Sequence, residues 1–209
     1  MSELIGINLN INQIPIQTPP RSNNYLIANK REVEKKNIEQ KTVELISDLL
    51  KGICDKNESQ PINFNSNILK PFTTKTRPSI SIKDYLLRLS KFTKMEESTM
   101  ILVLIYIDRI CNYNKIQLLY QNIFKIILAS AFVAIKFNED IHYSLEVYAK
   151  IGGVPPSELE YLEFHFLILI KFALNVNKTL YDKYSESLTS FQDDDEEEEE
   201  EENEEEENL

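Results

Sequence analysis

The sequence has few of the residues that catalytic sites need: four glycines and two histidines among 209 residues. The glycines do not form a phosphate-binding loop. His142 and His165 lack the spacing to cysteines or acidic residues that metal ligands show, and no nucleophile has an evident activating partner. These absences argue against an enzyme, and we expect no metal and no cofactor.

Cysteine is also scarce. Cys54 and Cys111 do not form a CxxC motif, which favours free thiols in a reducing compartment. The N-terminus shows no basic segment followed by an apolar run, so no signal peptide is expected. Together these features predict an intracellular protein of the cytoplasm, the nucleus or both.

Two apolar stretches organise the chain, Met100–Ile107 and Ile126–Phe137. Both are shorter than the roughly 18–20 residues that cross a bilayer, so we expect no contact with a membrane. A helix that is apolar on every side belongs in the centre of a bundle. The stretches therefore predict two core helices of one all-α domain.

Helical spacing of apolar residues extends the prediction on both sides. The expected segments are a mobile arm at 1–30, a helix at 31–54, a linker at 55–78, helices at about 81–92, 96–113, 118–137, 144–151 and from 155 onward, and a short helix at 177–190. Gly52 is a plausible helix stop. Ser81 with Asp84, and Thr93 with Glu96, resemble capping boxes.

The two ends of the chain differ from the middle. In the arm, isoleucine and leucine alternate with asparagine between residues 5 and 12, which also allows a strand or a docking peptide. Residues 191–209 are expected to be a disordered acidic tail, because 193–209 hold 14 acidic residues and no base. Without those acids, 20 acidic residues face 23 basic ones, so the predicted fold is close to neutral.

Two charges interrupt apolar helix faces. Lys136 follows Phe132 by four residues, and Glu163 precedes Phe166 by three, so each projects beside a core-facing side chain. An unpaired, half-buried charge costs several kcal/mol. The spacing therefore indicates an ion pair at the edge of the core, with separate exposure of each side chain to water as the alternative.

Residues 79–176 resemble a cyclin box, most closely that of the single-box, phosphate-pathway (P/U-type) cyclins. The matching motifs occur in family order: Ser79–Ile82 with Asp84–Leu86 and Arg88, Leu104–Arg109, Ala134–Phe137 with Asp140, Tyr148–Gly153 with Glu158-Leu159 and Leu162-Glu163, and then Phe166-Leu167 and Phe172–Leu174. One departure is Pro155-Pro156, where many relatives have a hydroxyl residue that caps the next helix.

This resemblance implies a single five-helix cyclin box around a central second helix, with an extra N-terminal helix and a short C-terminal one. It also implies a regulatory subunit that binds and activates a cyclin-dependent serine/threonine protein kinase. By carry-over from the family, Lys136 and Glu163 form the centre of the kinase-binding surface. Lys83 and Arg88 are further candidates, although a solvated helix face explains them more simply.

Two other functions stay open. A nucleic-acid module of the transcription-factor type would need a basic face, which a near-neutral fold with an acidic tail does not favour, so no nucleic-acid partner is expected. A non-kinase adaptor could use the tail to contact basic partners, although a solubilising tail is the simpler interpretation. Cell-cycle control, phosphate signalling and morphogenesis all suit the resemblance, and the sequence does not name the kinase.

Overall fold

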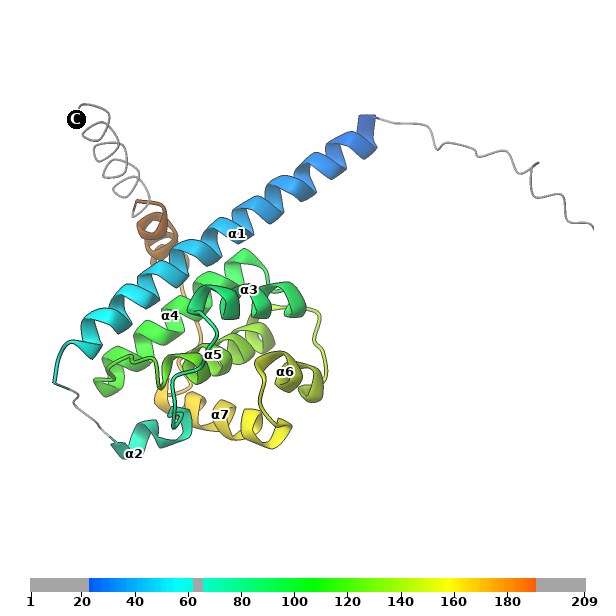
Figure 1. Cartoon of the computed structure of the whole chain (residues 1–209). Coiled ribbons are helices and arrows are strands. Elements are labelled where there is room, and N and C mark those ends of the chain that lie inside the picture. Colours follow the sequence, from blue (N-terminus) through cyan, green and yellow to red (C-terminus); the bar gives the residue numbers. More distant parts are fainter. Residues whose placement is uncertain (1–22, 62–65, 191–209) are drawn as a thin grey trace, which may run out of the picture. The chain divides into compact units, whose positions relative to one another are not determined.

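The computed structural model describes residues 23–61 and 66–190, and every regular element in these ranges is helical (Figure 1). The elements are α1 (Asn23–Glu58), α2 (Ser66–Leu69), the 3-10 helix η2 (Lys70–Phe72), α3 (Ile82–Thr93), α4 (Glu97–Asn114), α5 (Ile123–Asn138), α6 (Leu145–Gly152) and α7 (Pro156–Leu169). Residues 178–190 form a further helix, called here the C-terminal helix. The all-α prediction is confirmed for the described residues.

The chain divides into two compact units, residues 1–35 and 36–209. In the first unit, residues 23–35 form the start of α1. The second unit contains the rest of α1 and all later helices, and the hydrophobic core lies within it.

α4 forms the centre of this core. Every residue from Thr99 to Ile107 is buried, as expected for a helix with no polar face. α4 packs against α5 and α7. The Ser130 hydroxyl of α5 donates a hydrogen bond to the backbone oxygen of Val103, at 2.9 Å. The one hydroxyl within the second apolar stretch therefore has a hydrogen-bond partner inside the core.

Helix ends follow the sequence signals in several places. The Ser81 hydroxyl accepts from the backbone N–H of Asp84 at 3.0 Å, which caps α3 as predicted. Pro156 is the first residue of α7, where its missing N–H costs little. Gly152 is buried, and a Cβ there would lie 2.5 Å from a methyl carbon of Leu128, so glycine allows α6 to approach α5 closely.

Other expected boundaries are wrong. α1 begins at Asn23, inside the expected arm, and continues through Gly52 to Glu58. The segment expected as a linker contains α2 and η2, and Phe72 in η2 is completely buried. Thr93 does not begin the next helix. Its hydroxyl donates to the backbone oxygen of Leu89 at the end of α3. The predicted arm and tail at residues 1–22 and 191–209 lie outside the described residues.

The motif Leu104–Arg109 has a structural role. Tyr106 donates from its hydroxyl to the backbone oxygen of Leu174, at 2.8 Å. The Arg109 guanidinium donates to the backbone oxygens of Ala173 and Asn175, at 2.5 and 3.1 Å. The central helix therefore holds the segment that connects α7 to the C-terminal helix.

Candidate protein-docking surface

Lys136 and Glu163 come together as the spacing predicted. Lys136 lies in the last turn of α5 and Glu163 in the middle of α7. The Lys136 ammonium lies 2.5 Å from Oε1 of Glu163, which confirms the ion pair. The side chain of Lys136 is 48% exposed and that of Glu163 is 19% exposed, so the pair lies at the edge of the core.

The pair contributes little to stability at this depth. Exposed ion pairs are typically worth about 0–1 kcal/mol, because water screens them and two long side chains must be ordered. The ammonium also lies 5.1 Å from the ring centroid of Phe132, close enough for a modest cation–π attraction. An ammonium has three donors and a carboxylate has two acceptor oxygens. Because one donor and one oxygen form the pair, the remaining groups can meet polar atoms of a partner.

Large exposed apolar side chains also occur at the end of α5, just after α5, and on α7. Phe137, directly after Lys136, is 54% exposed, and Ile141 is 79% exposed. On α7, Tyr161, Phe164 and Ile168 are all exposed. Their spacing of three and four places them along one side of the helix, and Glu163 projects from a different side. The exposed apolar residue next to the ion pair in the chain is therefore Phe137.

His165 belongs to the packing of α7. Its Nδ1–H donates to the backbone oxygen of Tyr161 at 2.8 Å. Its ring centroid lies 4.0 Å from that of Tyr161 and 5.5 Å from that of Phe164. This imidazole therefore packs within the exposed aromatic side of α7.

The two other candidate residues have intramolecular partners. The Lys83 ammonium pairs with Glu44 of α1 at 3.0 Å, and this hydrogen bond raises the pKa of the lysine. Arg88 donates to the backbone oxygen of Lys150 in α6, at 3.1 Å. These contacts connect α3 to its neighbouring helices and do not include Lys136 or Glu163.

Both cysteines are free thiols. Burial raises the pKa of Cys54 and of Cys111 to about 12, and nearby acidic groups add to the effect. Both thiols are therefore protonated at neutral pH and are poor nucleophiles. Within the described ranges, no group of three or more histidine, cysteine or acidic residues could hold a metal ion.

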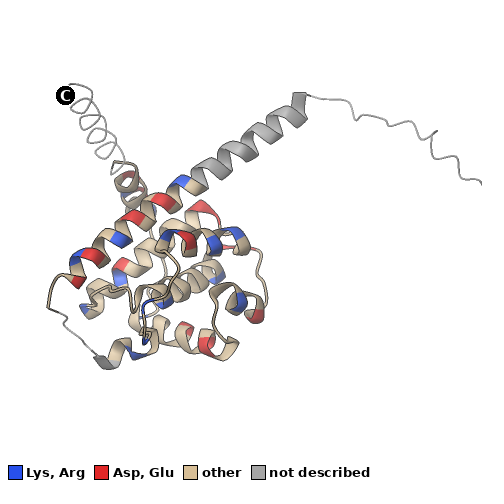
Figure 2. Ribbon diagram, viewed as in Figure 1, with Lys and Arg blue, Asp and Glu red and all other residues tan. Residues whose placement is uncertain are grey.

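Charges of both signs are spread over the helices. Figure 2 shows blue and red residues mixed over the ribbon in this view, without a basic stripe. A nucleic-acid site would need clustered basic residues. No helix in 23–61 or 66–190 is long and apolar enough to cross a bilayer.

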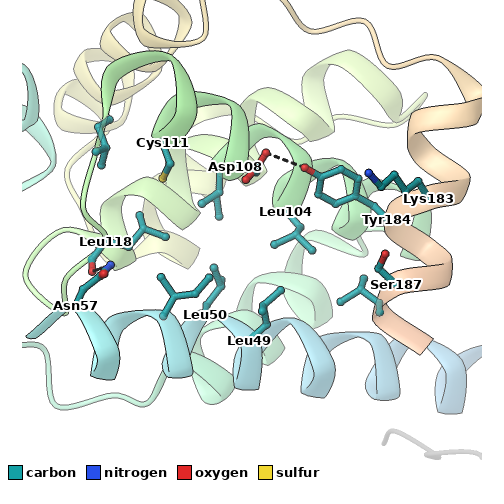
Figure 3. Close-up of a pocket in the computed structure, with 14 residues that line it drawn as sticks. Leu49, Leu50, Asn57, Leu104, Asp108, Cys111, Leu118, Lys183, Tyr184 and Ser187 are labelled. Atoms are coloured by element: carbon teal, nitrogen blue, oxygen red, sulfur yellow. Dashed lines mark hydrogen bonds between the residues drawn. The ribbon is translucent and has the colours of Figure 1, made fainter. Parts of the chain in front are cut away.

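The structure also contains a hollow that the sequence did not predict. A groove of about 460 Å³ lies between α1, α4 and the C-terminal helix (Figure 3). Its apolar lining includes Leu49, Ile53, Leu104, Ile107, Tyr184 and Leu188. The Tyr184 hydroxyl donates to Oδ2 of Asp108 at 2.7 Å, across one side of the groove. We call this hollow the α1 groove.

The central α4, the short α6 after α5, and the α5–α7 ion pair define a cyclin-type helical fold. A model of the cyclin family matches residues 27–174. The chain belongs to the cyclin family.

Its relatives include the U-type and P-type cyclins. It is 34% identical to Cyclin-U4-2 of Arabidopsis thaliana over 146 residues, which cover 68% of this chain and 67% of that protein. It is 32% identical to PHO85 cyclin-like protein psl1 of Schizosaccharomyces pombe over 166 residues, 73% of this chain and 68% of the relative. Cyclin-P4-1 of Oryza sativa subsp. japonica is 29% identical over 155 residues, 72% and 73% of the two chains. The predicted resemblance to P/U-type cyclins is confirmed.

Proposed function

We propose that this cyclin is a regulatory subunit that binds and activates a cyclin-dependent serine/threonine protein kinase. The observation that carries the proposal is the Lys136–Glu163 pair. Its lysine is half-exposed and its glutamate is partly exposed, and both keep unused donors or acceptors. The exposed Phe137 directly follows Lys136 in the chain. Membership of the cyclin family and the similarity to the relative named PHO85 cyclin-like protein psl1 support a kinase partner.

The mechanism we propose is a shift of population. A protein kinase is active when a lysine–glutamate pair forms inside it, which requires one of its helices to turn inward. A rigid surface that binds the inward state more tightly than the outward state increases its population. Because α5 and α7 pack against each other and against α4, they would present Lys136, Glu163 and Phe137 with little ordering cost.

Exchanging the charges of Lys136 and Glu163 separates an effect on kinase binding from an effect on folding stability. The double variant Lys136→Glu with Glu163→Lys preserves an ion pair between α5 and α7 but reverses both charges seen by a partner. We expect it to fold normally and to lose at least about 2 kcal/mol of kinase binding, roughly thirtyfold, as expected for a central contact. Binding is measured by titration of a candidate kinase, and activation by phosphate transfer to a peptide.

A second ion pair between the same helices gives a matched control. Lys125 lies 2.8 Å from Glu158, with side chains 21% and 31% exposed. The corresponding exchange, Lys125→Glu with Glu158→Lys, should leave kinase binding unchanged. Equal kinase binding by the Lys136/Glu163 exchange variant and the unmodified chain would refute the proposed docking surface.

Affinity purification of the tagged chain, followed by mass spectrometry, would identify the kinase and point to its pathway. We propose a partner among kinases of the phosphate-signalling or cell-cycle class, because the relatives of this chain include U-type and P-type cyclins and a protein named PHO85 cyclin-like protein psl1. Such a partner would place the chain in the cytoplasm or the nucleus, which imaging of a tagged chain would test.

A further inference from the structure

The helix α7 carries apolar residues on two sides. The side that faces the core consists of Leu159, Leu162, Phe166 and Leu169. Tyr161, Phe164 and Ile168 lie on the solvent side, and their side chains are 52%, 59% and 49% exposed. Phe172, four residues after Ile168, is 65% exposed. We call these four exposed residues the α7 strip, and exposed apolar surface of this kind is typical of protein-interaction sites.

The turn after α7 holds the last residue of the strip in an exposed position. Lys171 and Phe172 both have a φ of 56°, a left-handed conformation that residues other than glycine rarely adopt. The backbone N–H of Phe172 donates to the backbone oxygen of Leu167 at 2.9 Å, which fixes this turn. The Lys171 ammonium lies 5.0 Å from the ring centroid of Tyr113. An unfavourable backbone conformation that presents an exposed phenylalanine favours a role in binding.

Opposite charges lie at the two ends of the α7 strip. Glu160 is exposed directly before Tyr161, and Lys171 is exposed directly before Phe172. Between these two charges, Glu163 is the only Asp, Glu, Lys or Arg, and it projects from a different side of the helix. A strip that is acidic at one end and basic at the other is complementary to an inverted copy of itself.

An antiparallel second copy of α7 would bring these complementary residues together. Counted from residue 166, Phe164 lies two residues before and Ile168 two residues after. Glu160 lies six residues before the same point and Lys171 five residues after it. A twofold axis at this level therefore places Phe164 of each copy beside Ile168 of the other. It also places Glu160 of each copy near Lys171 of the other, and such a contact closes with two copies.

Other occupants suit the strip less well. A lipid surface favours Lys and Arg around an exposed aromatic strip. The helix α7 instead contains Glu158, Glu160 and Glu163 and no Lys or Arg. A peptide that binds as a strand needs an exposed sheet edge, and the described part of the chain has no strand. The charges along the strip therefore favour a second copy of this chain.

We propose that the chain forms a weak homodimer through antiparallel contact between the α7 strips of two copies. A buried aromatic side chain contributes about 150–250 Å², so four half-exposed side chains supply roughly 400 Å² from each copy and roughly 800 Å² in total. Stable interfaces bury about 1,200–2,000 Å². The dimer should therefore dissociate with a Kd on the order of 10–100 µM. This inference does not depend on the proposed kinase.

Sedimentation equilibrium of the full chain from about 1 to 300 µM measures the dimer. Ile168→Glu places two carboxylates in the centre of the contact and should weaken the dimer at least about tenfold. Phe164→Ser, which removes an aromatic ring without adding charge, is an independent second variant with the same expected direction. Phe92→Glu is the matched control, because Phe92 is 56% exposed on α3, outside the strip, and should leave the dimer unchanged.

Charge reversal at the two ends of the strip tests the antiparallel arrangement. Glu160→Lys and Lys171→Glu each place like charges opposite one another twice in the dimer. Each single variant should weaken the dimer about fivefold at low salt and less at physiological salt. The double variant, Glu160→Lys with Lys171→Glu, restores opposite charges at both places. Its Kd should return to within about twofold of that of the unmodified chain.

A thermal unfolding curve establishes that each variant folds. The exchange variant Lys136→Glu with Glu163→Lys should dimerise like the unmodified chain, so this proposal and the kinase proposal can fail separately. A chain that stays monomeric over the whole concentration range would overturn the homodimer, as would unchanged dimerisation of both Ile168→Glu and Phe164→Ser. A double charge variant that stays as weak as the single variants would overturn the antiparallel arrangement. Loss of kinase binding by Ile168→Glu in a chain that stays monomeric would assign the α7 strip to the kinase instead.

Discussion

Gly152 offers a sharp test of how tightly α6 packs against α5. A Cβ at this position would lie 2.5 and 2.7 Å from the two methyl carbons of Leu128, and 3.2 Å from its Cγ. Favourable carbon–carbon contacts lie at about 3.5–4.0 Å, so either the Leu128 side chain or the two helices would have to move by roughly 1 Å. Leu128 is only 2% exposed and has little free space to move into. Gly152→Ala therefore forces a rearrangement of the core.

The expected cost follows from two opposing effects. Overpacking a well-packed core costs about 1–3 kcal/mol. Alanine is a better helix former than glycine by up to about 1 kcal/mol, but Gly152 is the last residue of α6, so only part of this gain is realised. The backbone oxygen of Gly152 also accepts a buried hydrogen bond from the Tyr85 hydroxyl, at 3.0 Å, which a shift of α6 would lengthen. We expect a net loss of about 1–2 kcal/mol.

Urea unfolding monitored by circular dichroism measures this loss. Gly52→Ala is the internal control, because Gly52 is exposed inside α1, which continues to Glu58, and a Cβ there meets nothing within 4 Å. That variant should gain about 0.5–1 kcal/mol from helix propensity alone. The two glycine-to-alanine changes should thus shift the unfolding midpoint in opposite directions. A stabilised Gly152→Ala variant would refute the argument that glycine is needed for close approach.

Two further predictions concern helix capping and pH. Ser81→Ala should destabilise the chain by about 1 kcal/mol in urea unfolding, because the backbone N–H of Asp84 loses the hydroxyl that caps α3. Ser79→Ala, at a nearby exposed serine, is the control and should change the free energy of unfolding little. Raising the pH from 9 to 12 should lower the free energy of unfolding progressively. Burial raises the pKa of the Cys54 and Cys111 thiols from 9.0 to about 12, so the unfolded chain loses these protons first. A flat profile above pH 9 would contradict this prediction.

Patterns of apolar residues were sufficient to predict the main core helices. Spacings of three and four predicted α3 and α7, and two uninterrupted apolar stretches predicted α4 and α5. The same spacing placed Lys136 and Glu163 beside core-facing residues, and an exposed ion pair resulted. The helices and the side on which each charge projects depend on neighbours within a turn or two, so the sequence determined them by itself. The contact between Lys136 and Glu163 also required α5 to pack against α7.

Tertiary packing decided several features that short-range sequence patterns did not predict. Gly52 does not end α1, because Val43, Ile46, Leu50 and Cys54 bury one side of that helix in the core and outweigh the cost of a single glycine, about 1 kcal/mol. Phe72 is buried in a segment rich in proline and polar residues, because the core has room for its ring there. Arg109 meets backbone oxygens more than 60 residues away in the chain. The α1 groove combines three helices distant in sequence, and such sites exist only when the complete fold brings their side chains together.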